Sequence, residues 1–410
     1  MRDRYAEYKD SGSIWAGDIP SNWDSIRLQF LCDISTGNKD TVDRDDSGKY
    51  PFYVRSPIIE HINSYSFDGE AVLMAGDGAG AGRIFHYANG KFDYHQRVYN
   101  LHNFRRVSGK YLYYFLQENF HKEIDRSNAR STVDSVRLPM LQDFVITFPN
   151  NIDEQAYIVE YLDDSTKKID ESVANLQSQS SMLTCYKRDL IAECVTKGLD
   201  KSAPMKPSGE DWIGDVPEHW QIVPLRAFLK PNNRKNPGGF PLLSVERERG
   251  VVNRETDGSP DNHNRVPDDL SNYKMVDEGQ FVMNKMKAWQ GSYGVAPCAG
   301  IVSPAYYVYD LVVENKEFFN YALRSKCYVG FFGRDSYGIR IDQWDFKAEY
   351  IKHIPFVAPP IEEQKEIVNY LSKQESKINR LQANIEAQIQ KLKDYRRILI
   401  HDAVTGKIKI

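Results

Sequence analysis

The sequence contains two copies of one pattern, and this duplication constrains the fold more than any other feature. The segment WAGDIPSNW, from Trp15 to Trp23, returns as WIGDVPEHW from Trp212 to Trp220, 197 positions later. Four of the six tryptophans lie in these two segments, so coincidence is a poor explanation. A repeat of about 200 residues is far longer than a solenoid unit of roughly 20 to 50 residues. The pattern therefore predicts two similar halves and a pseudo-twofold molecule, which suits a target that itself has two parts.

A second repeated element follows each half and is typical of a long helix. Acidic residues open both copies, Asp153-Glu154 in the first and Glu362-Glu363 in the second, where the helix dipole favours negative charge. Apolar residues then recur at every seventh position, which predicts a coiled-coil seam. The seam residues are Leu162, Ile169, Leu176, Leu183 and Leu190 in the first helix and Leu371, Ile378, Ile385, Leu392 and Leu399 in the second. Each residue of the second series lies 209 positions after its counterpart, so both helices share one register.

These patterns divide the chain into five segments and predict an α+β fold. The segments are two mixed α/β domains (1–150 and 211–360), two long helices (151–198 and 361–410) and a linker (199–210). Short β-type runs punctuated by glycine and aspartate fill each domain. The predicted strands cover 50–54, 71–74, 97–101, 240–245, 281–283 and 306–309, and aromatic residues at helical spacing predict helices over 111–120 and 318–323.

Composition argues against several classes of protein. A hydrophobic content of 41% with 27% charged residues is ordinary for a globular protein. There is no apolar run of about 18 residues and no signal-like stretch after Met1, so we expect a cytoplasmic protein without a membrane span. The five cysteines form no Cys-x-x-Cys pair, which disfavours a zinc site or a disulfide framework. The net charge of −4 argues against an independent nucleic-acid binder and leaves local basic surface or a partner to supply phosphate contacts.

Motifs for catalysis and for nucleotide binding are absent from the sequence. The loop Asp77 to Arg83 (DGAGAGR) has Gly-x-Gly-x-Gly spacing and precedes a strand-like run, so it predicts a hairpin loop rather than a dinucleotide site. Its lack of side chains lets the backbone approach another surface closely. We find no His-Glu-x-x-His, no Gly-x-Ser-x-Gly and no Asp/Asn-Pro-Pro-aromatic tetrapeptide. No catalytic residue, bound cofactor or metal site is therefore predicted, and His86, His95 and His102 are interpreted as ordinary surface or core histidines.

Basic residues mixed with amide and aromatic side chains are the candidates for contact with nucleic acid. Arginines and amides read base edges, whereas lysines mostly anchor phosphates. The candidates are Arg83, Gln96 and Arg97 in the first half and Asn284, Lys285, Lys287 and Gln290 in the second. A single cluster of this kind is more often a solvated face, but its occurrence in both halves favours the functional interpretation.

The repeated segments together resemble the specificity subunit of type I restriction–modification systems. Trp-x-Gly-Asp-Ile/Val-Pro-x-x-Trp stands before each β-rich domain, and PPIEEQ (359–364) opens the second helix. The first copy departs from the diproline start and has NNIDEQ (150–155) there, which leaves the role of the segment unchanged. The resemblance runs from Trp15 to Gly406. It implies two target recognition domains separated by two antiparallel coiled-coil helices, each domain reading one half-site of a bipartite, asymmetric double-stranded DNA target.

The resemblance also implies that partner chains perform the chemistry. Two methyltransferase subunits, which carry S-adenosylmethionine and methylate adenine at N6, would dock on the helices, and motor–nuclease subunits would join for cleavage. The half-site centres would lie roughly one helical turn, about 10 bp, apart. Two alternatives stay open: a non-catalytic coiled-coil scaffold that binds proteins without recognising DNA, and an enzyme with a site around residues 77–83. Salt-dependent DNA binding would exclude the scaffold, and turnover by the isolated chain would reveal an enzyme.

Overall fold

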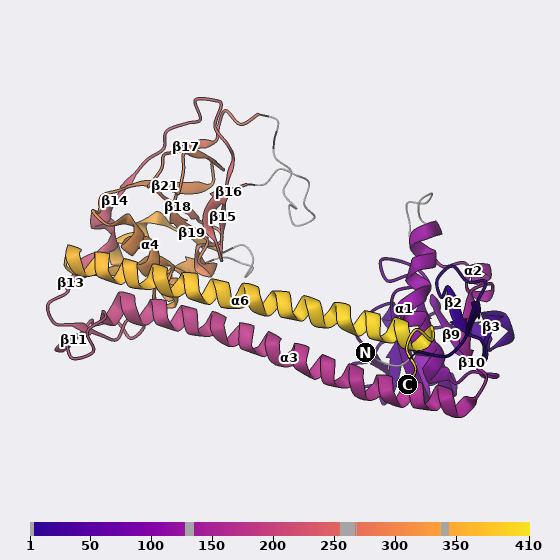
Figure 1. Cartoon of the computed structure of the whole chain (residues 1–410). Helices are drawn as coiled ribbons and strands as arrows, with labels where there is room; N and C mark the ends of the chain where they lie inside the picture. Colours follow the sequence, from indigo (N-terminus) through magenta and orange to yellow (C-terminus); the bar gives the residue numbers. More distant parts are fainter. Residues whose placement is uncertain (1–3, 128–134, 255–266, 268, 338–343) are drawn as a thin grey trace. The chain divides into compact units, whose positions relative to one another are not determined.

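The computed structural model describes residues 4–127, 135–254, 267, 269–337 and 344–410. The chain forms two compact units: unit 1 comprises Met1–Gln177 and Glu386–Ile410, and unit 2 comprises Ser178–Ile385. The two long helices, α3 (Ile152–Lys197) and α6 (Ile361–Val404), each contribute one part to each unit (Figure 1). Each unit therefore combines a mixed α/β domain with parts of both helices, and the predicted α+β class is confirmed.

Unit 1 is built on a six-stranded sheet in the order β4-β9-β7-β8-β5-β6. All neighbours pair antiparallel except β5 and β8, which are parallel. The strands are β4 (Asp33–Thr36), β5 (Tyr50–Tyr53), β6 (Glu60–Ile62), β7 (Phe67–Ala75), β8 (Phe85–Tyr94) and β9 (Val98–His102). The sheet curls, because the Tyr94 hydroxyl at the end of β8 lies 3.1 Å from Ser35 Oγ on the edge strand β4. This curl brings loops from several strands together.

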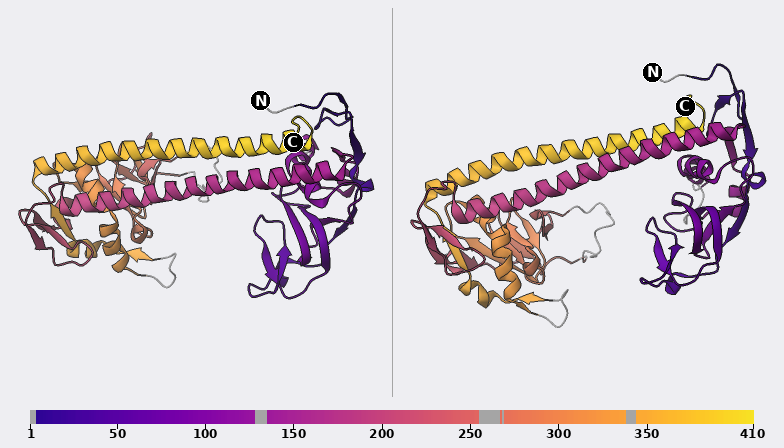
Figure 2. Two further views of the ribbon diagram at one scale, coloured as in Figure 1. Left: turned by 60° about the horizontal axis from the view of Figure 1, so that its bottom comes forward. Right: turned by 90° about the horizontal axis from the view of Figure 1, so that it is seen from below.

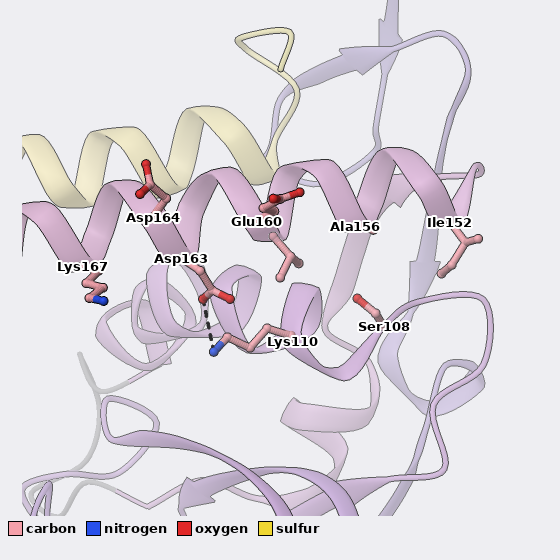
Figure 3. Close-up of a pocket in the computed structure, with 9 residues that line it drawn as sticks. Ser108, Lys110, Ile152, Ala156, Glu160, Asp163, Asp164 and Lys167 are labelled. Atoms are coloured by element: carbon pink, nitrogen blue, oxygen red, sulfur yellow. Dashed lines mark ion pairs between the residues drawn. The ribbon is translucent and has the colours of Figure 1, made fainter.

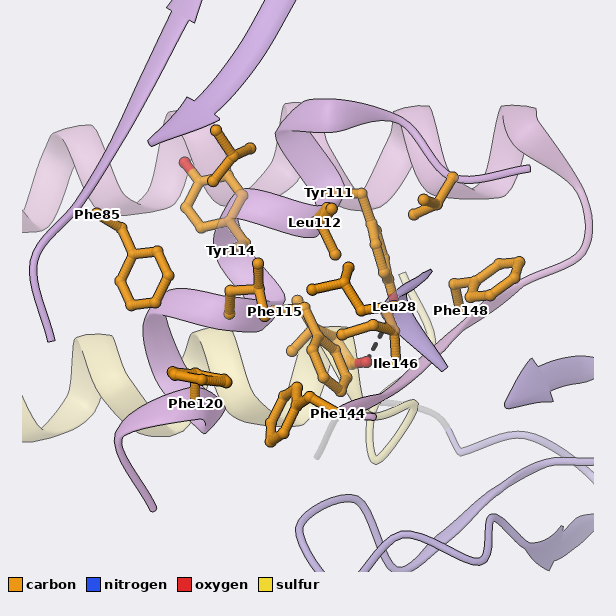
Figure 4. Close-up of a cluster of buried hydrophobic side chains, with 14 of the residues drawn as sticks. Leu28, Phe85, Tyr111, Leu112, Tyr114, Phe115, Phe120, Phe144, Ile146 and Phe148 are labelled. Carbon is orange, nitrogen blue, oxygen red and sulfur yellow. Dashed lines mark hydrogen bonds between the residues drawn. The ribbon is translucent and has the colours of Figure 1, made fainter. Parts of the chain in front are cut away.

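An aromatic core joins this sheet to the helices of unit 1. In α1 (Gly109–Ser127), Tyr111, Phe115 and Phe120 are fully buried, and Figure 4 shows them against Phe144 and Phe148. Tyr111 and Phe115 are four positions apart and share one helix face. Phe120 joins the same core through Phe144, whose ring centroid lies 6.4 Å from that of Phe115 and 4.9 Å from that of Phe120. The same core takes in apolar residues of both α3 and α6, which anchors the two helices to the domain. The remaining elements are β1 (Tyr8–Asp10), β2 (Asp18–Pro20), β3 (Trp23–Arg27), η1 (Leu28–Phe30), η2 (Thr41–Asp43), α2 (Leu138–Gln142) and β10 (Val145–Pro149).

Unit 2 repeats the topology of unit 1. Its four-stranded sheet has the order β14-β21-β18-β19, which corresponds to β4-β9-β7-β8. These strands are β14 (Leu229–Pro231), β18 (Phe281–Asn284), β19 (Tyr293–Val295) and β21 (Tyr306–Leu311). The pair β13 (Gln221–Pro224) with β24 (Pro355–Ala358) repeats β3 with β10, and β11 (Met205–Pro207) with β12 (Asp215–Pro217) repeats β1 with β2. The duplication in the sequence is thus a duplication of strand order and pairing.

Further elements complete unit 2. They are η4 (Leu225–Phe228), β15 (Leu243–Glu246), β16 (Gly250–Asn253), β17 (Lys274–Val276), η5 (Ala288–Gln290), β20 (Gly300–Val302), α4 (Lys316–Arg324), α5 (Lys326–Arg334), β22 (Ser336–Tyr337), β23 (Asp345–Phe346) and η7 (Ala348–His353). The helix α4 follows β21 as α1 follows β9. Among the described residues, no helix is both long and apolar enough to cross a membrane.

The two repeated sequence motifs contact each other within each unit. In unit 1 the indole N–H of Trp23 donates to Glu154 Oε1 at 2.9 Å, and in unit 2 that of Trp220 donates to Glu363 Oε2 at 2.9 Å. Both tryptophans are fully buried, and both glutamates lie in the first turn of a long helix. Because a buried N–H without a partner is costly, each tryptophan requires the acidic start of its helix. This contact explains why the two motifs recur together.

The helices α3 and α6 lie alongside each other in each unit (Figure 2). In unit 1, Arg396 Nε donates to Asp170 Oδ1 at 3.0 Å, and in unit 2, Lys187 Nζ donates to Asn379 Oδ1 at 3.3 Å. Residues 187 and 396, like 170 and 379, are 209 positions apart, so the two contacts are equivalents with the helices exchanged. Such an exchange requires antiparallel helices. All ten predicted seam residues are buried or half-buried, as a packed seam requires.

Candidate nucleic-acid interface

Most of the residues chosen from the sequence lie at equivalent connections of the two sheets. The connection from β7 to β8 carries Arg83, and the connection from β18 to β19 carries Lys285, Lys287 and Gln290. Since β7 and β8 correspond to β18 and β19 in the strand order, these two connections occupy the same place in the fold. Gln96 and Arg97 lie in the turn between β8 and β9.

In unit 1, the pairing of the sheet brings three loops together around Asp77. The ends of β7 and β9 meet because Ala75 pairs with Val98, and Gly76 N donates to Arg97 O at 2.8 Å. The end of β5 joins them because His95 N donates to Tyr53 O at 2.9 Å.

The loop residues meet through side-chain contacts. Asp77 Oδ1 accepts from Arg55 Nη1 at 2.8 Å, and its Oδ2 lies 3.7 Å from Arg97 Nε. One carboxylate therefore contacts two arginines from different loops, and both guanidinium groups are substantially exposed.

The turn before β9 is held by a buried histidine. His95 is 2% exposed, and its Nδ1 accepts from the backbone N–H of Arg97 at 2.9 Å. Burial lowers the pKa of His95, and the positive charge of Arg55 lowers it further. The neutral ring therefore carries its proton on Nε2, which faces Asp40 Oδ1 at 3.7 Å. Gln96 Nε2 donates to the same carboxylate, at 2.8 Å from Oδ2, so the turn is tied to the loop after β4.

Arg83 belongs to the same face but has a different partner. Its Nη2 donates to Asp125 Oδ1 on α1 at 2.6 Å. The preceding Gly82 has φ +62° and packs so closely on α1 that a Cβ would lie 2.7 Å from Ile124 Cγ1. Only glycine fits this position. A groove of about 600 Å³ lies beside Arg83 and Asp77, and residues of the loop after β5 form its other wall.

In unit 2, the connection after β18 is shaped by Asn284. This residue is buried, its Oδ1 accepts from Met286 N at 3.2 Å, and its Nδ2 donates to the Tyr306 hydroxyl at 3.3 Å. Its amide thus organises the turn, and a contact of Asn284 with DNA stays a prediction.

The other candidates of unit 2 reach the surface to different degrees. Lys285 Nζ pairs with Asp345 Oδ2 at 3.0 Å, Lys287 is exposed and Gln290 is half-buried. Trp289, two residues after Lys287, packs on Trp344 with 5.3 Å between ring centroids.

Two residues of the unit 1 cluster, Arg55 and Asp77, were not among the sequence candidates for DNA contact. Their positions in the sequence could have marked them as candidates, because Arg55 follows a predicted strand and Asp77 opens the glycine-rich loop. Neither position indicates that they meet each other and Arg97. That proximity depends on which strands are neighbours, and strand neighbours are not a local property of the sequence.

Comparisons with known proteins agree with this architecture. Residues 20–178 match the model of the type I restriction modification DNA specificity domain. The chain is 21% identical over 417 residues to the type I restriction enzyme EcoDI specificity subunit of Escherichia coli, which covers 96% of this chain and 90% of that protein. It is 25% identical over 225 residues to the type I restriction enzyme MjaVIII specificity subunit of Methanocaldococcus jannaschii, which covers 52% of this chain and 50% of that protein.

A solved structure shows the same fold. It comes from work on complex assembly and conformational transition of the type I R-M system. The TM-score is 0.64 at 14% sequence identity, and the match covers 94% of this chain and 98% of that chain.

Proposed function

We propose that this chain is a specificity subunit of a type I restriction–modification system and that it directs the system to a bipartite, asymmetric DNA sequence. The observation that carries the proposal is the pair of equivalent sheet connections, one in each unit, that present basic and amide side chains. One recognition surface in each unit suits a target with two half-sites. The chain itself is not an enzyme, because specificity subunits are the non-catalytic members of these systems.

The two connections differ in chemistry, which supports an asymmetric target. The connection of unit 1 is rich in glycine and adjoins three arginines, whereas that of unit 2 carries lysines, a glutamine and a tryptophan. Because different side chains prefer different base edges, the two surfaces are expected to read different half-sites. The near-neutral charge of the chain is compatible with this role if the methyltransferase subunits supply most phosphate contacts.

We further propose that two methyltransferase subunits dock on α3 and α6 and carry the S-adenosylmethionine. Support comes from exposed aromatic side chains at equivalent positions of the two helices. Tyr186 is 54% exposed and Tyr395, 209 positions later, is 49% exposed. Large exposed aromatic residues are typical of protein interfaces. Two copies of one surface on a single chain suit two copies of one partner. The association with motor–nuclease subunits follows from the family alone.

Each unit also has a groove at the start of its long helix, and the first residue of that helix lines it in both units. In unit 1, a groove of about 600 Å³ lies between α3 and the start of α1 (Figure 3). Ile152 and Ser108 line it, together with an ion pair between Lys110 Nζ and Asp163 Oδ1 at 3.2 Å. In unit 2, a groove of about 630 Å³ at the start of α6 is lined by Ile361, the counterpart of Ile152. Both grooves are suited to contacts with a partner protein.

The proposal is tested by co-expressing the chain with the methyltransferase gene of its system, followed by single-molecule methylome sequencing of the host. We expect a split motif that carries N6-methyladenine on both strands and has two different halves. Expression of the methyltransferase alone is the matched control and should yield no such motif. A palindromic motif would contradict the asymmetric target. A stable complex without any new motif would contradict DNA recognition and favour the protein-binding scaffold.

A further inference from the structure

We propose that Arg55 and Arg97 read guanine in the half-site bound by unit 1, and that Asp77 is the positioning residue that holds them in place. The inference rests on the proposed function and deepens it, because it assigns a base type and three residues to one half of the target. It depends on the contacts of a single carboxylate, which the sequence does not reveal.

The geometry leaves the base-reading edge of Arg97 available. Asp77 Oδ2 lies near its Nε, at 3.7 Å, so the carboxylate approaches the inner edge of the guanidinium. Within the part of the chain that the structure describes, the terminal nitrogens of Arg97 have no hydrogen-bond partner, and the side chain is 66% exposed. A guanidinium can donate two parallel hydrogen bonds to O6 and N7 of guanine, the commonest specific contact with that base.

Arg55 is held by the other oxygen of the same carboxylate. Its Nη1 donates to Asp77 Oδ1 at 2.8 Å, so Asp77 joins two arginines that belong to different loops. Two guanidinium groups this close repel each other, and the shared negative charge offsets that repulsion. Arginines that are already ordered lose less side-chain entropy when they bind. Asp77 thereby prepares both side chains for binding.

The backbone around Asp77 is fixed on both sides. Asp77 forms an isolated antiparallel bridge with Ser135, and Val136 N donates to Gly76 O at 2.8 Å. Gly76 N in turn donates to Arg97 O at 2.8 Å. The carboxylate therefore projects from a hydrogen-bonded segment at the base of the loop, which is what a positioning residue requires.

The charge of Asp77 favours a base over a phosphate as the ligand of these arginines. A phosphate that approached either guanidinium would come within a few ångströms of the carboxylate, where like charges repel. The major-groove edge of guanine offers two acceptors without a formal charge. Arg83 provides the contrast, because its Nη2 is engaged by Asp125 on α1 and it lies outside the Asp77 contacts. We expect Arg83 to contact the DNA backbone.

The test compares methylomes produced by complexes that contain the full-length chain or a variant of it. Arg55→Ala and Arg97→Ala should each lower methylation at the original motif by about 10- to 100-fold or relax a guanine position in one half-site, with the other half unchanged. Asp77→Asn keeps the shape but removes the charge, and it should relax the same half-site. The matched control Arg83→Ala should weaken methylation evenly without changing the motif. Thermal melting of each variant monitors folding, and an unaltered second half-site shows that the complex assembles.

The outcomes separate this inference from the function on which it rests. If the wild-type chain yields no split motif, both are refuted. If it yields a motif that Arg55→Ala and Arg97→Ala leave unchanged, only the inference is refuted. A motif that has no guanine in the affected half would also overturn it. An even loss of methylation with an intact motif, in both variants, would show that the two arginines bind phosphate.

Discussion

The glycines that end the two long helices allow a quantitative test of how α6 is held to unit 1. Gly406 and Gly198 follow α6 and α3 at equivalent places, with φ of +69° and +71°. A Cβ at Gly406 would lie 2.3 Å from Pro20 Cδ, whereas one at Gly198 would lie 2.8 Å from Glu363 Oε1, the end of a flexible side chain. We therefore expect Gly406→Ala to destabilise the chain more than Gly198→Ala.

The expected magnitudes follow from two separate costs. An alanine in the left-handed region costs about 1 to 2 kcal/mol. Overpacking against a rigid neighbour adds about 1 to 3 kcal/mol, and Pro20 is a buried ring in β2 that cannot move aside easily. Gly406→Ala is thus expected to cost about 2 to 5 kcal/mol. Gly209→Ala is the matched control, because Gly209 has φ +85° and no atom lies within 4 Å of its Cβ position. Gly209→Ala should cost only about 1 to 2 kcal/mol, the cost of the left-handed backbone.

The measurement is unfolding of the purified full-length chain by heat and by urea, followed by far-UV circular dichroism and tryptophan fluorescence. For a unit of about 200 residues, each 1 kcal/mol shifts the melting temperature by roughly 2 to 4 °C. Gly406→Ala should then lower the first melting transition by several degrees more than Gly209→Ala does. Equal shifts for these two variants would refute the reasoning, because they would show that the end of α6 does not press on Pro20.

Two further predictions concern partner docking and pH. Tyr186→Ser and Tyr395→Ser should each reduce the number of methyltransferase subunits bound per chain from two to one, as measured by sedimentation velocity. The control Lys393→Ser changes an exposed residue on another face of α6 and should leave two subunits bound. Unchanged stoichiometry in the tyrosine variants would argue against this docking surface. Burial and the charge of Lys122 lower the pKa of His401 to about 4, so the fold favours the neutral ring. Because this pKa lies below the ordinary value near 6.5, stability is full above about pH 6.5 and falls as the pH drops toward 4, by about 1 to 2 kcal/mol for a partly exposed group. His401→Gln should flatten this dependence in urea titrations, and an unchanged slope would exclude His401 as its source.

Local patterns in the sequence predicted the helices well. The helix that we expected to begin near Asn151 and end near Gly198 covers Ile152–Lys197, and its counterpart covers Ile361–Val404. Periodicity, acidic first turns and terminal glycines are all short-range signals. Each predicted strand overlaps a strand of the structure, although the one predicted over 240–245 begins only at Leu243. The residues after Asp77 form a connection between β7 and β8 as expected.

The residues of the candidate site were predicted less completely. Arg83 lines a groove together with Asp77, and Arg97 contacts Asp77. The role of the Asp77 carboxylate in connecting Arg97 with Arg55 was not predicted. Asn284 was chosen as an amide in a basic segment; the structure shows that it shapes a turn, and its contact with DNA stays a prediction. Composition identifies the type of contact that a segment can make, and burial decides which side chains are available for it.

The sequence by itself determined that the molecule is duplicated, that two long helices share one register and that the chain contains no familiar catalytic motif. These properties follow from residue order over short distances and from comparison of the chain with itself. Only the tertiary structure decided that the indole N–H of Trp23 donates to Glu154, that Gly406 lies against Pro20, and that Asp77 contacts both Arg55 and Arg97. The physical reason is that strand order and sheet curl arise from burial summed over a whole unit, so the loops that they bring together need share no pattern in the sequence.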